Sequence, residues 1–191
     1  MFRRMTRERY LSDPELARFM AVVRERRHVH QPRDHALFAL LANTGLRPSE
    51  ARALTRGDCH LEGRAPWVRV WRLKKKKTLP EFDDLPIPEM VGEPLAALIA
   101  RLPPGPEQRL FMIHPRQMQR LFHSYCRLAS VRRINLYSLR HTAATRLYCA
   151  TRNIRTVQAV LGHESPDMTT LYAHIPDRIL RDLAASFPAA V

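Results

Sequence analysis

The sequence predicts a mainly α-helical protein with one small antiparallel β-sheet, an α+β fold. Apolar residues recur at helical spacing along most of the chain, and a period of two replaces that spacing only between Pro66 and Pro88. A chain of 191 residues can bury one sizeable core. We therefore expect a single domain over residues 1–191, with a basic N-terminal arm at 1–9 and a separate C-terminal segment at 176–191.

The first three helices are indicated by their start and stop signals. Ser12-Asp13-Pro14-Glu15 combines a capping box with an early proline and predicts a helix that ends near Arg26. A second helix is expected from Pro32 through Leu41; it is apolar nearly all round and should lie in the core. Asn43-Thr44-Gly45 ends it, and Pro48 favours the start of a short third helix.

The segment between Pro66 and Pro88 predicts the sheet. Apolar residues alternate with arginines as far as Leu73, and apolar residues return at Leu85. This pattern is typical of two antiparallel strands, and the turn between them carries the lysine run Lys74–Lys77.

Helical spacing resumes after the sheet. Ser138 is expected to cap one of these helices, and Gly162 to terminate another. A short helix should carry Tyr172. The expected helices span residues 90–101, 116–130, 138–150 and 154–161, with a short one from 166 or 167 and an amphipathic one at 176–185.

The charge of the chain favours a polyanionic partner. Lys and Arg number 32 against 18 Asp and Glu, which gives a formal charge of +14 and points to nucleic acid. A membrane is disfavoured because no run approaches the ~18 apolar residues of a spanning helix. The segment Met1–Arg7 has no apolar stretch behind its charges and does not resemble a signal peptide. We expect a cytoplasmic protein.

Cysteines and histidines indicate no metal site. The three cysteines are widely spaced, which argues against a disulfide framework and a structural zinc site. A group of histidines beside Asp34 matches no ligand spacing and is interpreted as a solvated helix boundary. We expect no metal and no other cofactor. The residues concerned are Cys59, Cys126, Cys149, His28, His30 and His35.

Five residues whose side chains suit phosphate chemistry fall at expected element edges: Arg47, a lysine of the turn, Arg140, His163 and Tyr172. Arg140 and His163 are 23 residues apart, and His163 and Tyr172 nine. Side chains at such edges can converge on one group. Two arginines can hold the non-bridging oxygens of a phosphate without a metal, and a tyrosine can attack phosphorus and hold it covalently.

These residues resemble the tyrosine recombinase or phage integrase family. The resemblance runs from about Thr6 to Ala185 and implies the catalytic-domain fold of that family. The matching stretches are Thr44-Gly45-Leu46-Arg47-Pro48-Ser49-Glu50, the strand-turn-strand with its lysines, Leu139-Arg140-His141, Leu161-Gly162-His163 and Tyr172-Ala173-His174.

The resemblance also implies roles for the reacting residues. Arg47 and Arg140 match the two arginines that clamp the phosphate, and His163 matches the histidine that hydrogen-bonds it. Tyr172 matches the nucleophile that forms a 3′-phosphotyrosine link and expels a 5′-hydroxyl. Lys74 is our choice for the lysine that protonates the leaving oxygen, because it follows the expected strand directly.

The remaining roles follow in the same way. Lys75 and Lys76 stay open as alternatives for the protonating lysine, and the run through Lys77 is expected to contact DNA. Glu50 matches an acid beside the first arginine, and His141 a helix residue that supports the site.

The chain departs from the family pattern at Tyr137, where the family usually has a histidine three residues before the second arginine. A phenol, with an ordinary pKa near ~10, is a poorer general base at neutral pH than imidazole, although it can donate a hydrogen bond to phosphate. We therefore expect a lowered or retuned rate. The chain also begins almost directly at the catalytic domain, so we expect a single-domain recombinase, similar to those that invert fimbrial promoter segments, or a fragment.

The expected function is site-specific DNA recombination without metal or ATP, by an enzyme encoded in a bacterium, phage or plasmid. The expected partner is double-stranded DNA carrying a recombination site, bound by a homotetramer that associates weakly off DNA; an accessory DNA-bending protein is a further expected partner. One alternative is relaxation of supercoils, as by a type IB topoisomerase. Another is a DNA-binding module of the same fold with weak catalysis. Integration, excision, inversion and resolution all stay open as outcomes.

Overall fold

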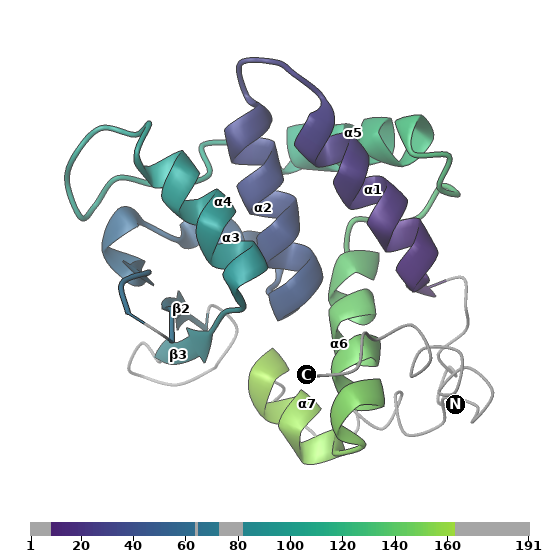
Figure 1. Ribbon diagram of the computed structural model, residues 1–191. Coiled ribbons are helices and arrows are strands. Elements are labelled where there is room, and N and C mark those ends of the chain that lie inside the picture. The colour runs from purple at the N-terminus through teal and green to yellow at the C-terminus, as the bar shows by residue number, and fades with distance from the viewer. Residues whose placement is uncertain (1–8, 64, 73–81, 163–191) are drawn as a thin grey trace.

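The computed structural model describes residues 9–63, 65–72 and 82–162, which form a group of helices beside a small sheet (Figure 1). The helices are α1 (Asp13–Glu25), α2 (Gln31–Thr44), α3 (Pro48–Ala53), the 3-10 turn η2 (Arg56–Asp58), α4 (Glu89–Ile99), α5 (Pro115–Leu128), α6 (Ser138–Thr151) and α7 (Ile154–Leu161); the strands are β1 (Cys59–His60), β2 (Trp67–Trp71) and β3 (Phe82–Pro86). Each described α-helix, and the pair of strands β2 and β3, was expected within a few residues of these bounds; η2 was not predicted.

Helix α2 lies at the centre of the core, as its nearly uniform apolar composition predicts. Every residue from Ala36 to Ala42 is buried, and α1, α4 and α6 pack around the helix. The rings of Phe19, Phe38, Phe122 and Tyr125 join α1, α2 and α5, with Phe19 and Phe38 edge to face at 5.3 Å. This aromatic contact fixes the helices that lead to the candidate site.

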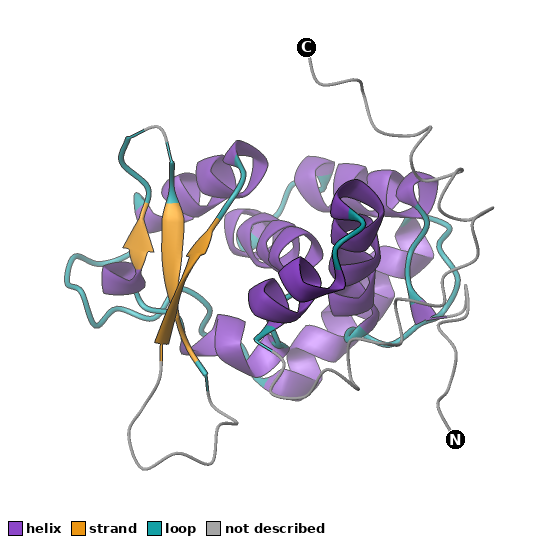
Figure 2. Ribbon diagram, turned by 90° about the horizontal axis from the view of Figure 1, so that it is seen from below, coloured by secondary structure: helices purple, strands orange, loops and turns teal. Residues whose placement is uncertain are grey.

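The sheet is antiparallel with strand order β1-β2-β3, and it forms one end of the molecule (Figure 2). Val68 and Val70 of β2 and Leu85 of β3 are buried, so alternate residues face the core as expected. Strand β1 was not predicted, because two residues are too short to show a period. Strand β2 ends at Trp71, two residues earlier than expected.

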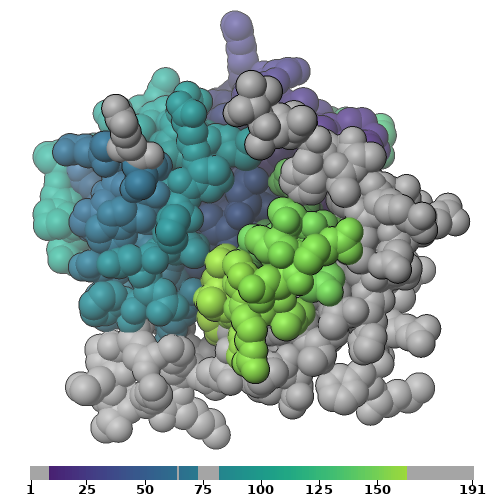
Figure 3. All heavy atoms as spheres, turned by 60° about the horizontal axis from the view of Figure 1, so that its bottom comes forward, coloured from purple at the N-terminus to yellow at the C-terminus, as the bar shows by residue number. Residues whose placement is uncertain are grey.

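Helices α6 and α7 lie against the sheet side of the molecule. Figure 3 shows their yellow-green atoms beside the blue and teal atoms of the chain that carries the sheet. Leu85 and Pro86 of β3 and Val160 and Leu161 of α7 line one small pocket of about 200 Å³ between them. The ends of β3 and α7 are therefore close together.

The helix start at Ser138 differs from the prediction. The N-cap residue of α6 is Tyr137, and Ser138 is the buried first residue of the helix, so it does not cap. Asn135 forms the turn that leads into the helix: its side-chain oxygen accepts from the Tyr137 N–H at 2.8 Å and its carbonyl from the Ser138 N–H at 2.9 Å. The predicted capping box of α1 and the glycine ends at Gly45 and Gly162 are confirmed.

The helix boundary beside Asp34 is confirmed, since α2 begins at Gln31. The prediction that this boundary is solvated holds for the exposed His30 but was wrong for Asp34 in the first turn. Asp34 is fully buried; its carboxylate accepts from the Tyr125 hydroxyl at 3.0 Å and pairs with Arg33 at 2.8 Å. Burial, and then the Asp34 carboxylate, raise the pKa of the Tyr125 phenol. Tyr125 is 91 residues away, so local spacing gave no sign of this partner.

Several predictions fall on residues outside the described ranges. These are the basic arm, the lysine turn, the residues His163 and Tyr172, and the helices expected from 166 onward. Among the helices that the structure does describe, none has the length and apolar character needed to cross a membrane.

Candidate active site

The carboxylate of Glu50 is the centre of a buried group of arginines. Glu50 lies in the first turn of α3 and is 1% exposed. Arg47, the N-cap residue of α3, donates to it twice, from Nη1 to Oε1 at 2.6 Å and from its backbone N–H to Oε2 at 2.8 Å. The Arg47 side chain is 17% exposed. Glu50 thus holds the backbone of Arg47 through the capping contact and its side chain through the ion pair. The Arg47 guanidinium is therefore held in place.

Arg140 reaches the same carboxylate from α6. Its Nη1 lies 4.0 Å from Glu50 Oε2 and donates to the Gly45 carbonyl at 2.6 Å, while Nη2 donates to the Leu161 carbonyl at 2.9 Å. The Arg140 side chain is only 2% exposed. Arg47 is therefore the more exposed of the two arginines.

Tyr137 and His141 flank Arg140 on the same helix. The Arg140 guanidinium lies over the Tyr137 ring at 5.9 Å from its centroid, and the Tyr137 and His141 rings meet edge to face at 5.4 Å. Burial, with the charges of Arg9 and Arg140, lowers the pKa of His141 to about 4. His141 is therefore neutral at pH 7, as a supporting residue of a cationic site should be.

Arg72 is a third arginine of this group, and we did not predict it. Its Nη1 lies 3.6 Å from Glu50 Oε2, its Nε donates to Asp83 at 2.6 Å and its Nη2 donates to the Val160 carbonyl at 3.2 Å. A signal was present: counting by twos from Val68 and Val70 places Arg72 on the buried face. We call Glu50 with Arg47, Arg72 and Arg140 the arginine cluster.

The arginine cluster suits an anion. Three guanidinium groups face two carboxylates, Glu50 and Asp83, so the group retains net positive charge. Guanidinium groups bind phosphate through paired N–H donors. Lys74 follows Arg72 by two residues and His163 follows Gly162 directly, but both, like Lys75, Lys76, Lys77 and Tyr172, lie outside the described ranges. Within those ranges no three His, Cys, Asp or Glu residues gather where they could hold a metal ion.

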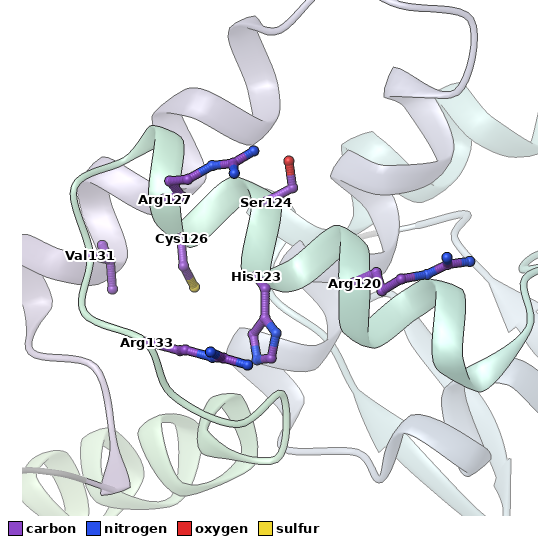
Figure 4. A pocket seen from close by; sticks show the side chains of 7 residues that line it. All are labelled: Arg120, His123, Ser124, Cys126, Arg127, Val131 and Arg133. Atoms are coloured by element: carbon purple, nitrogen blue, oxygen red, sulfur yellow. The ribbon is translucent and has the colours of Figure 1, made fainter.

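A second basic feature is an open pocket of about 600 Å³ along α5 and the segment that follows it (Figure 4). Figure 4 shows Arg133 reaching from that segment toward the ring of His123, while Arg120 extends along the helix on the other side. Arg120, Arg127 and Arg133 are exposed, and in the described part of the chain none of them pairs with a carboxylate. This surface therefore offers uncompensated positive charge.

Known proteins match both the sequence and the fold. A family model described as the phage integrase family matches residues 9–178. A tyrosine recombinase of Pseudothermotoga lettingae is 31% identical over 151 residues, which cover 76% of this chain and 51% of that protein. The tyrosine recombinase XerC of Neisseria gonorrhoeae is 31% identical over 171 residues, 83% of this chain and 52% of that protein. The chain thus spans about half the length of these relatives.

Solved structures of recombinases have the same fold. The XerH site-specific recombinase, in a post-cleavage complex with a palindromic difH substrate, superposes with a TM-score of 0.76 at 22% identity, over 93% of this chain and 52% of that one. The catalytic domain of bacteriophage HP1 integrase superposes with a TM-score of 0.64 at 22% identity, over 94% of this chain and 95% of that one. The predicted fold class is confirmed.

Proposed function

This chain belongs to the phage integrase family, and we propose that it cleaves and rejoins DNA strands at a specific site through a covalent link to Tyr172. The observation that carries the proposal is the arginine cluster. Arg47 and Arg140 come from distant parts of the chain and meet at one buried carboxylate, leaving an excess of positive charge suited to a phosphodiester.

The proposed reaction is a pair of transesterifications. The Tyr172 phenol releases its proton to solvent as its oxygen attacks phosphorus, the bond from phosphorus to the 5′-oxygen breaks, and that oxygen takes a proton from Lys74. A 5′-hydroxyl then attacks the phosphotyrosine and gives its proton back to Lys74. The bond from phosphorus to the Tyr172 oxygen breaks, and that oxygen takes a proton from solvent. The bond energy of the strand is kept in the phosphotyrosine link, so the steps require no ATP or metal.

The arginines and the histidine stabilise the reacting phosphate. Arg47 and Arg140 neutralise charge on its non-bridging oxygens, and His163 donates a hydrogen bond to it. Tyr137 takes the position of the usual histidine, and its hydroxyl donates to the phosphate without serving as an efficient base. The edge of the Arg140 guanidinium is prealigned by the Gly45 and Leu161 carbonyls.

Duplex DNA is the proposed substrate, and its backbone the main source of affinity. The exposed arginines of the α5 pocket carry charge that no described carboxylate offsets, and Lys75, Lys76 and Lys77 add to it. Contacts of this kind release counterions, so binding weakens steeply with salt. A homotetramer on two DNA sites, aided by an accessory DNA-bending protein, is the proposed working assembly, in the cytoplasm.

The test is formation of a denaturation-resistant protein–DNA adduct. The chain and its Tyr172→Phe variant are incubated with labelled nicked duplexes tiled from the DNA that flanks the gene. An adduct that is lost in the variant supports the proposal and identifies the DNA site. Salt-sensitive binding with no adduct on any duplex contradicts it and leaves the DNA-binding module. Relaxation of supercoiled plasmid without strand exchange favours the topoisomerase-like alternative. The DNA-binding module with weak catalysis is favoured by one observation, the presence of Tyr137 in place of the usual histidine.

A further inference from the structure

Arg72 joins three parts of the chain whose ends adjoin the proposed reacting residues. It directly follows β2, and its ion pair with Asp83 of β3 closes the base of the connection between these strands. Its Nη2 bond to the Val160 carbonyl holds the last turn of α7. Its Nη1 faces Glu50, which in turn holds Arg47. A single side chain therefore ties the strand pair, α3 and α7 together.

The contact with Glu50 is electrostatic. Both Glu50 oxygens already accept hydrogen bonds from Arg47. The Arg72 Nη1 is buried and has no hydrogen-bond partner among the residues that the structure describes. An unpaired buried donor costs free energy unless a neighbouring charge offsets that cost. Glu50 at 3.6 Å supplies the charge, so the position of the carboxylate depends on Arg72 as well as on Arg47.

The main chain leaves room for this guanidinium. A Cβ atom at Gly162 would stand 2.7 Å from both Cζ and Nε of Arg72, and Gly162 has a φ of +62°. Glycine is thus the residue that lets the end of α7 close over the arginine. With the Arg72 side chain only 2% exposed and its donors directed to Asp83, Val160 and Glu50, its contacts are with protein groups.

We propose that Arg72 is a positioning residue of the cleavage site: it orients Glu50, and through Glu50 the clamping arginines Arg47 and Arg140. This inference rests on the proposed function. It assigns Arg72 no contact with DNA and no proton transfer. Its loss should lower the rate of cleavage in bound DNA and leave the binding itself intact.

The first experiment measures single-turnover adduct formation at saturating nicked duplex for Arg72→Met. We expect a loss of about 100-fold, because a small misplacement of catalytic groups costs this much. Arg69→Met is the matched control, since Arg69 lies on β2, three residues before Arg72, and also pairs with an aspartate, Asp84, but at the surface. It should stay within about twofold of the parent, and Arg72→Lys should recover part of the rate.

Binding measurements separate positioning from direct contact. The slope of log affinity against log salt is unchanged in Arg72→Met if the residue only positions, and falls by about one if it contacts a phosphate. An unchanged cleavage rate in a folded Arg72→Met protein overturns the inference, and so does a reduced salt slope. Thermal unfolding identifies the folded variants, and Arg72→Lys replaces Arg72→Met if the latter does not fold.

A second measurement does not depend on cleavage. Guanidinium N–H groups held in hydrogen bonds give resolved NMR signals. Arg72→Met should shift the signals of the Nη groups of Arg47 and Arg140, which donate to Glu50, Gly45 and Leu161, while Arg69→Met leaves them in place. Unmoved signals overturn the inference even if the parent cleaves DNA. If the parent forms no adduct, signals that shift in Arg72→Met still support the positioning role. The missing adduct then counts against the proposed function alone.

Discussion

Arg140 Nη1 donates a 2.6 Å hydrogen bond to the carbonyl oxygen of Gly45, so the end of α2 and the first turn of α6 meet inside the arginine cluster. Gly45 is the C-cap of α2 and has a left-handed φ of +67°. That conformation turns its carbonyl toward Arg140 and directs the chain on to Arg47, two residues later. One glycine thus positions both arginines.

Gly45→Ala should therefore damage both stability and cleavage. A Cβ atom there would lie 2.6 Å from Leu161 Cδ2 in a backbone conformation that costs side chains energy, and we expect a loss of roughly 2 kcal/mol or more. Chemical denaturation measures it. Gly63→Ala is the control, because Gly63 has a φ of +88° but no described residue places an atom within 4 Å of the added Cβ. Equal losses in the two variants would show that packing at Gly45 is unimportant.

Tyr137→His should raise the rate of adduct formation at neutral pH. Imidazole is the better proton acceptor, and we expect a gain of at least about tenfold. Tyr137→Phe keeps the ring against Arg140 and removes the hydroxyl, so it should lower the rate below that of the parent. The comparison is made by single-turnover kinetics on one duplex. A histidine variant slower than the phenylalanine variant would contradict a place for this side chain beside the phosphate.

The fold could be read from the sequence because its elements are set locally. The capping box at Ser12, the apolar helix α2 and the glycine ends all act within a few residues, and each was placed correctly. The proposed roles of Arg47 and Arg140 came from a resemblance, and the structure brings the two to one carboxylate.

Contacts between distant segments were the ones missed. Arg72 has partners on α3, β3 and α7, and Asp34 is satisfied by Tyr125 from α5. Neither set of contacts produces a local pattern. For Arg72 the strand period gave its side of the sheet but not its partners, and Arg72 was counted only as one of the arginines that alternate with apolar residues along the strand.

His141 should make stability depend on pH in acid. Its pKa is about 4 in the folded chain, against an ordinary value of 6.5, because the site is buried and cationic. Between these two pH values the unfolded state binds more protons, so the stabilisation is complete above pH 6.5 and is lost as pH falls toward 4. The full effect is on the order of 3 kcal/mol.

The measurement is the free energy of unfolding from pH 7 to pH 4 for the parent and for His141→Gln. Other titrating groups contribute equally to both proteins, so the difference between the two curves reports His141. We expect the parent to lose more stability across this range than the variant. Parallel curves would mean that His141 titrates near its ordinary pKa in the folded state.

The exposed arginines of the α5 pocket should set the salt dependence of DNA binding. Arg127→Gln and Arg133→Gln should each weaken binding to any duplex and each lower the slope of log affinity against log salt by about one, because each removes one phosphate contact. Arg24→Gln removes the same charge from an exposed arginine already paired with Glu25 at 3.1 Å and should leave the slope unchanged. If the pocket variants keep the parent slope, DNA lies elsewhere, and the uncompensated charge of α5 serves another polyanion or none.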